Sequence, residues 1–173
     1  RQMYDPWHFR FTRTGDNRFL SVYPKVIART IVSSRDAWAR LISPGDGRIV
    51  RIDRIISIED QVSIYSRFFL AAEKFGGFMD KSIQELESLN FKTILRHEYN
   101  LSIRYMNHTI RMARLPAEVA KALRLPRGVS GTQLSIVALS SLKAPTYYQD
   151  VFIPPNDLTL HISDSAFIPE RWS

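Results

Sequence analysis

The stretch RIVRIDRIISIEDQVSIYSRFFLA, from Arg48 to Ala71, decides the fold of this chain. It contains two runs rich in β-branched and aromatic residues, 48–58 and 61–71, with Glu59 and Asp60 between them. Residues of these types favour strands, and two strands joined by a short polar turn pair with each other in antiparallel fashion. We therefore predict a β-hairpin at this point in the chain.

The sequence on either side adds strands and short helices. Further extended segments are indicated at 7–12, 19–32, 133–141, 146–153 and 158–162, and helices at 35–42, 80–89 and 117–123. The segment 91–110 is mixed, with an early part that could be helical and β-like residues at 99–105. This order predicts an α+β fold with a mostly antiparallel sheet and flanking helices. No repeat or linker interrupts it, so we expect one domain over residues 1–173, in which 1–30 form an N-terminal strand and linker region.

Composition excludes several classes of protein. The 173 residues include no cysteine, which excludes disulfide scaffolds, thiolate zinc sites and cysteine nucleophiles. The apolar runs are far shorter than the ~20 residues of a membrane-spanning helix. No signal peptide opens the chain, which starts at Arg1 instead of a methionine. We expect a fragment or processed chain of a cytoplasmic protein that has no membrane partner.

Charge suggests the kind of partner. Lys and Arg outnumber Asp and Glu by 24 to 17, and most of the basic residues are arginines, whose forked guanidinium suits carboxylate and phosphate. A nucleic acid or a small acidic ligand would fit, and so would a basic surface that only maintains solubility. There is no phosphate-binding glycine loop and no catalytic motif, and the four histidines are scattered. We expect no cofactor, no metal site and no catalytic residues.

Arg54 interrupts an apolar stripe on the first strand of the hairpin. Alternate residues of a strand point to the same face, so Arg54 shares a face with Ile52 and Ile56. A buried guanidinium requires an anionic partner. That partner is either an internal carboxylate, for which Asp150 and Glu98 are candidates, or an anionic ligand.

Two other strands carry candidate ligand-binding residues. Tyr65 lies in a polar alternation on the second strand of the hairpin, which suits a pocket wall or a solvated face. On a later strand, Tyr148 and Asp150 share one face, while Tyr147 and Gln149 point to the other. The adjacent tyrosines provide stacking surface and hydroxyl groups, or they are aromatic residues of a core or dimer interface.

The helix expected from Asp80 offers a possible anion site. Its first turn contains Ser82 and Gln84. The unpaired N–H groups and positive dipole of such a turn attract anions, and the Ser82 hydroxyl could contribute. The alternative is an ordinary helix cap, which Asp80 already provides.

Four segments together resemble a known family. They are the short helix 34–41 followed by Gly47 and the strand 50–54, the hairpin return 59–70, the segment Lys81-Ser82-Ile83-Gln84-Glu85-Leu86, and the helix 116–123 with Gly128 ahead of the tyrosine-rich region 147–160. In this order they resemble the UTRA domain, the effector-binding half of GntR-type transcription regulators of the HutC subfamily. The resemblance covers roughly residues 30–163.

The resemblance implies a chorismate-lyase-like fold with a ligand cleft. It implies that Arg54 and Ser82 contact the effector, with Tyr65, Gln84 and Tyr147 as further candidates beside Asp150. The family's second arginine, two positions after the first, is replaced here by Ile56.

The resemblance also implies partners. They are a small anionic metabolite, a second copy of the chain in a homodimer, and DNA, bound through an upstream winged-helix domain that this chain lacks. Two alternatives to a ligand sensor remain open: a chorismate pyruvate-lyase-like enzyme on the same fold, and a plain dimerisation module.

Overall fold

The computed structural model describes residues 9–162 of the chain, so Trp7 and His8 of the expected first strand lie outside the described residues. Its elements are β1 (Phe9–Arg13), β2 (Val22–Ser33), α1 (Ala37–Ile42), β3 (Arg48–Ile58), β4 (Val62–Ala71), α2 (Ala72–Phe75), the 3-10 helix η1 (Gly76–Met79), α3 (Ile83–Ser88), α4 (Phe91–Tyr99), β5 (Ile103–Arg114), α5 (Ala117–Ala122), β6 (Ser130–Ser140), β7 (Pro145–Ile153) and β8 (Leu158–Ile162).

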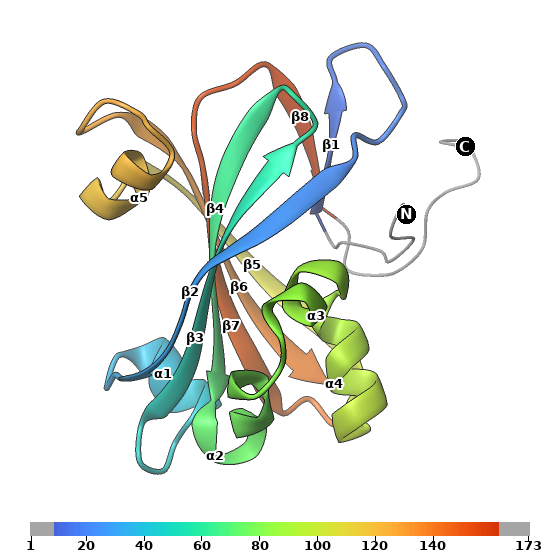
Figure 1. Ribbon diagram of the computed structural model, residues 1–173, viewed down its shortest axis with the longest axis vertical. Helices are drawn as coiled ribbons and strands as arrows, with labels where there is room; N and C mark the ends of the chain where they lie inside the picture. Colours follow the sequence, from blue (N-terminus) through green and yellow to red (C-terminus); the bar gives the residue numbers. More distant parts are fainter. Residues whose placement is uncertain (1–8, 163–173) are drawn as a thin grey trace.

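A six-stranded sheet organises the molecule (Figure 1). Its strand order is β2-β3-β4-β7-β6-β5, and every neighbouring pair is antiparallel. β1 and β8 form a separate two-stranded antiparallel sheet. The predicted α+β class with a mostly antiparallel sheet is therefore confirmed.

The predicted hairpin of β3 and β4 is also confirmed. The two strands pair from Ile49 opposite Ala71 to Ile58 opposite Val62. The turn between them closes where the Gln61 N–H donates to the Ile58 carbonyl at 3.1 Å. Alternation then assigns each side chain of both strands to one of the two faces of the sheet.

We call one face the α4 face. It carries the stripe of β3 that contains Ile52 and Ile56, and it packs against η1, α3, α4 and the β1–β8 pair to form the main core. Figure 1 shows α3 and α4 together on one side of the sheet and α1 and α5 on the other. The main hydrophobic core therefore lies between the sheet and the α4 side.

We call the opposite face the α5 face. α1 covers one end of it through Ala39 and Ile42, which pack on Phe69. α5 covers the other end through Val119, in a separate apolar cluster. A polar region separates these two clusters, and in it Arg51 donates to Asp53 at 2.6 and 2.8 Å.

Two local expectations require correction. The helix expected over 35–42 begins only at Ala37, with Asp36 at its N-cap. The helix expected from Asp80 begins only at Ile83, because Ser82 and Glu85 form a reciprocal capping box at its start.

The mixed segment 91–110 resolves into two elements. α4 occupies 91–99, with Asn90 at its N-cap and Asn100 in the left-handed region (φ 49°) at its end. Asparagine tolerates that conformation, so it stops the helix before β5 begins.

Within residues 9–162, no helix has both the length and the apolar composition needed to cross a bilayer.

Candidate functional site

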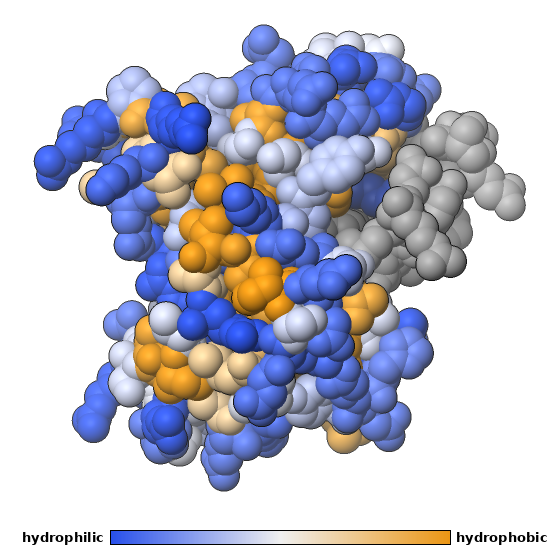
Figure 2. All heavy atoms as spheres, in the orientation of Figure 1, coloured by the Kyte–Doolittle hydropathy of each residue, from blue (hydrophilic) through white to orange (hydrophobic). Residues whose placement is uncertain are grey.

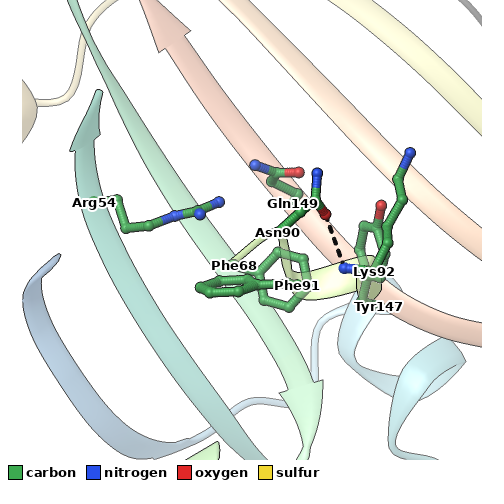
Figure 3. A pocket seen from close by; sticks show the side chains of 7 residues that line it. All are labelled: Arg54, Phe68, Asn90, Phe91, Lys92, Tyr147 and Gln149. Atoms are coloured by element: carbon green, nitrogen blue, oxygen red, sulfur yellow. Dashed lines mark hydrogen bonds between the residues drawn. The ribbon is translucent and has the colours of Figure 1, made fainter. Parts of the chain in front are cut away.

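A small pocket lies where the start of α4 meets the middle of the sheet (Figure 3). It is lined by Arg54 from β3, Phe68 from β4, Tyr147 and Gln149 from β7, and Asn90, Phe91 and Lys92 from the start of α4. The cavity is about 20 Å³, roughly the space that one water molecule needs. This is the α4 face, where the sequence placed Arg54 among apolar neighbours.

Arg54 is the central charged group of the pocket. Its side chain lies over the Phe91 ring, with the guanidinium carbon 4.0 Å from the ring centroid, and the residue is 4% exposed. Burial lowers the pKa of Arg54 from 12.5 to about 10. The guanidinium is therefore still a cation at neutral pH, in surroundings that strengthen its attraction for an anion.

The first turn of α4 forms a second wall. Asn90 caps this helix by accepting the Lys92 N–H on its side-chain oxygen at 2.9 Å, which orients the turn toward the pocket (Figure 3). Lys92 itself lines the cavity and adds a second positive charge. The start of a helix also carries a partial positive charge of its own.

The sheet provides the neutral polar groups of the pocket. The Gln149 side-chain amide donates to the Ser66 hydroxyl at 2.9 Å. Tyr147 is 1% exposed, and burial raises its pKa, so its hydroxyl keeps its proton and can donate a hydrogen bond. Phe68 lies against the Tyr147 ring at a centroid distance of 4.5 Å and supplies apolar surface.

The described residues that line this pocket carry charges of one sign. Two of the seven lining side chains are cations, and none of the seven is an Asp or a Glu. The lining therefore suits an anion with an apolar body and hydrogen-bonding groups, and it disfavours an ammonium group. Among residues 9–162, no group of three or more metal-ligating side chains is found.

The residues predicted from the sequence fall into three places. Arg54 and Tyr147 meet in the pocket. Tyr65 and Asp150 lie on the α5 face, on the opposite side of the sheet from Arg54. Ser82 lies at the start of α3, where its side chain is exposed.

Tyr65 and Asp150 are engaged within the α5 face. The Tyr65 hydroxyl donates to Asp53 at 2.7 Å, and burial together with this bond raises the pKa of Tyr65 to about 12. One Asp150 oxygen accepts hydrogen bonds from Gln133, Ser135 and Tyr148 at 3.1, 2.6 and 2.9 Å. An internal Arg54–Asp150 pair was therefore a wrong expectation, because the sheet lies between the two side chains.

Glu98, the other internal candidate for Arg54, forms an ion pair with Lys81 instead. Lys81 lies one residue before the Ser82 cap, so this pair ties the end of α4 to the start of α3.

Ser82 and Gln84 belong to a helix start that is already occupied. The Glu85 carboxylate accepts both the Ser82 N–H, at 3.0 Å, and the Ser82 hydroxyl, at 2.9 Å. α3 has only six residues, and Gln84 is exposed on it. The helix start that faces Arg54 is that of α4.

The sequence analysis did not predict that residues at the start of α4 line the pocket. Asn90 followed by buried positions 91, 94 and 95 is a cap with helical spacing, which was a usable signal. Alternation placed Gln149 on the same face as Tyr147, but Gln149 was not among the predicted site residues. That α4, and not α3, lies over Arg54 has no local signal.

Known proteins provide the last line of evidence. The UTRA domain profile matches residues 25–158. A search of curated proteins found no match.

Several solved structures have the same fold. The ligand-binding domain of a putative GntR-family transcriptional regulator from Bordetella bronchiseptica has a TM-score of 0.73 at 12% identity, covering 95% of this chain and 100% of its own. PhnF from Mycobacterium smegmatis has a TM-score of 0.69 at 15% identity, covering 81% and 61%. The C-terminal domain of Yurk from Bacillus subtilis has a TM-score of 0.67 at 17% identity, covering 75% and 88%.

These likenesses confirm the expected chorismate-lyase-like fold. The residues that match the UTRA profile make up well over half of the chain. They include β3, β4, α4 and β7, which carry the residues that line the pocket. The chain therefore belongs to the UTRA domain family.

Proposed function

We propose that this chain is the effector-sensing domain of a GntR-type transcription regulator of the HutC kind and that it binds a small acidic metabolite at Arg54. The observation that carries the proposal is the pocket on the α4 face, where a buried guanidinium, Lys92 and a helix start converge, with no carboxylate among the lining residues that the structure describes. The solved relatives described as ligand-binding or effector domains support the same role.

The size of the pocket suggests how sensing works. A cavity of about 20 Å³ is too small for a metabolite. Binding therefore requires the start of α4, above all the Phe91 ring over Arg54, to move away from the sheet. A ligand that binds the open arrangement better shifts the population toward it, and this shift is the signal.

The remaining partners follow from this role. The signal passes to DNA through a winged-helix domain outside this chain, two copies of the sensor act as a homodimer, and the regulator works in the cytoplasm. The lyase-like alternative has less support, because a lyase needs an acid near the leaving group and the lining residues within 9–162 include none.

A thermal-shift screen of this chain tests the proposal. The panel pairs carboxylates and phosphates with amines of the same carbon skeleton. A ligand at ~100 times its dissociation constant stabilises a protein by about 2.7 kcal/mol, which corresponds to roughly 5–10 °C for a chain of this size. We expect shifts with acidic members only.

Two variants locate the site. Arg54→Met keeps a long side chain in the core, so it should fold and yet lose the ligand-dependent shift. Arg40→Ala, on the exposed side of α1, removes a charge of the same sign far from the pocket and should keep the shift. A shift that survives Arg54→Met, or a panel in which only amines act, would refute the proposed site.

Two further results would favour the alternatives. Release of pyruvate from chorismate would identify an enzyme. A folded dimer that responds to no compound would indicate a dimerisation module.

A further inference from the structure

A strip of polar side chains crosses the α5 face between the helices α1 and α5. This polar strip contains Arg51, Arg67, Gln133, Ser135 and Tyr148, each of which is partly exposed to solvent. Figure 2 shows that the outline of the molecule narrows between the α5 region and the α1 region, on the left of the view. A small molecule can therefore reach this part of the sheet without entering the pocket at Arg54, which lies on the other face.

Two opposite charges at the centre of the polar strip face each other without pairing. Arg67 of β4 lies directly opposite Asp150 of β7 in the register of the sheet. Side chains at such positions have Cβ atoms ~4.5–5.5 Å apart, and opposite charges there stabilise each other. Among residues 9–162, however, the ion pair of Arg67 is with Glu118 of α5, and none is found to Asp150. The two charges therefore have separate partners.

Asp150 keeps one carboxylate oxygen available. The residue is only 9% exposed, and its Oδ1 atom accepts all three hydrogen bonds from Gln133, Ser135 and Tyr148. Within the described part of the chain, no partner is found for its Oδ2 atom. A buried carboxylate without a cation is costly, so Oδ2 should attract a positively charged donor such as an ammonium group.

Arg67 also has a donor available. Its guanidinium carbon lies 5.0 Å from the centroid of the Phe152 ring, and one of its terminal nitrogens donates to Glu118. Its Nε atom is buried and has no hydrogen-bond partner among the residues that the structure describes. A carboxylate bound in the forked manner would accept from Nε as well. Glu118 is 59% exposed and also pairs with Arg51 at 3.5 Å, so it can leave Arg67 and keep a cationic partner.

We propose that the polar strip is a second ligand site, which binds the zwitterionic group of a free α-amino acid between Arg67 and Asp150. The carboxylate of the amino acid replaces Glu118 on Arg67, and its ammonium group donates to Oδ2 of Asp150. Both charged groups of an α-amino acid are attached to one carbon, which suits two protein charges at opposed positions of neighbouring strands. The inference goes beyond the proposed function, because the described lining of the effector pocket carries only positive charge.

The surroundings of the two charges favour an amino acid with an aromatic side chain. The ring of Tyr148, which contacts Asp150, stacks on Trp38 of α1 at a centroid distance of 4.8 Å. The Phe152 ring lies beside Arg67. Aromatic surface is thus present near both charges, and a further ring can pack against it. L-Phenylalanine is accordingly the probe for this site.

Isothermal titration calorimetry with three related compounds tests the charge requirement. L-Phenylalanine has both charged groups, phenylpropionate lacks the ammonium group, and phenylethylamine lacks the carboxylate. We expect L-phenylalanine to bind ~10-fold or more tightly than either, because each of the others loses hydrogen bonds between charged groups. Arg54→Met, which alters the effector pocket on the other face, should retain this binding.

Two variants in the polar strip locate the ligand. Asp150→Asn keeps an oxygen that can accept the internal hydrogen bonds and removes the charge, so it should weaken L-phenylalanine binding ~10-fold. Glu118→Gln removes the competitor for Arg67 at an exposed position, so it should fold and tighten binding about 2–5-fold. Glu73→Gln, which removes the same charge from an exposed position on α2, is the matched control and should leave the affinity unchanged.

The contrary outcomes are distinguishable. No heat of binding with L-phenylalanine, or binding that neither Asp150→Asn nor Glu118→Gln changes, overturns this inference and leaves the proposed function intact. Binding that is lost in Arg54→Met would place the amino acid in the effector pocket, which also overturns the inference. If binding at the polar strip follows the expected pattern while no acid acts through Arg54, the inference stands and the proposed effector site is refuted.

Discussion

At the scale of single residues, Glu59 shows how one side chain holds a turn. Its backbone is left-handed (φ 44°), which is unfavourable for a side chain of this kind. Its carboxylate accepts the Arg18 guanidinium at 2.9 Å and the Ser21 N–H at 3.0 Å, and this joins the β3–β4 turn to the segment before β2. These hydrogen bonds lower the pKa of Glu59 from 4.5 to about 2.

The lowered pKa predicts a pH dependence for Glu59→Gln. A carboxyl group with a folded-state pKa below its unfolded value contributes stability that is fully present above about pH 4.5 and is lost as the pH falls toward 2. We expect the variant to melt at a lower temperature than wild type at pH 6, with a difference that shrinks below pH 4.5. A difference that is constant with pH would contradict the assignment.

At the scale of elements, the starts of α3 and α4 perform different tasks with similar chemistry. Both begin at a polar cap, Ser82 for α3 and Asn90 for α4. The α3 cap closes on its own Glu85, whereas the α4 cap lines the pocket beside Arg54. Only the second should therefore influence ligand binding.

Two cap variants separate these tasks. Ser82→Ala and Asn90→Ala should each destabilise the fold by about 1 kcal/mol, since each leaves a backbone N–H of the first helical turn without its acceptor. We expect urea unfolding to show this loss in both variants, and effector affinity to fall only in Asn90→Ala. Weaker binding in Ser82→Ala with unchanged binding in Asn90→Ala would place the ligand at α3 instead.

At the scale of the whole molecule, both faces of one sheet are covered by different layers. The α4 face holds the main core and the pocket, and the α5 face holds two smaller apolar clusters with an ionic network between them. Figure 2 shows polar side chains over most of the visible surface, with apolar side chains gathered in a band across its middle. The same sheet therefore supports the packed layers on both of its faces, so a change in the spacing of its strands should destabilise both layers.

Gly131 tests that packing. A Cβ at this position in β6 would lie 2.5 Å from the Ile153 carbonyl oxygen of β7 and 3.0 Å from a Leu115 methyl carbon. We expect Gly131→Ala to lose roughly 1–3 kcal/mol in chemical unfolding, because backbone cannot move aside cheaply. Gly76→Ala, where a Cβ would meet nothing within 4 Å, should be close to neutral. Equal stability of the two variants would refute this account.

Much of the sheet was predictable because its signals are local. Alternation along β7 correctly placed Tyr147 and Gln149 on one face and Tyr148 and Asp150 on the other, and alternation along β3 correctly placed Arg54 beside Ile52 and Ile56. The helix starts were less predictable, since serine, aspartate and asparagine all make good caps and the choice depends on the residue three positions later. That is why the expected cap at Asp80 moved to Ser82.

The sequence by itself determined the fold class, the central hairpin and the burial of a guanidinium in an apolar stripe, because the two-residue period of a strand needs no knowledge of distant contacts. Only the tertiary structure decided what lies over that guanidinium. Tyr65 and Asp150 are separated from Arg54 by the thickness of the sheet, and α4, not α3, brings Asn90 and Phe91 to it. The physical reason is that alternation specifies the face of a side chain, whereas packing between layers specifies which residues meet there.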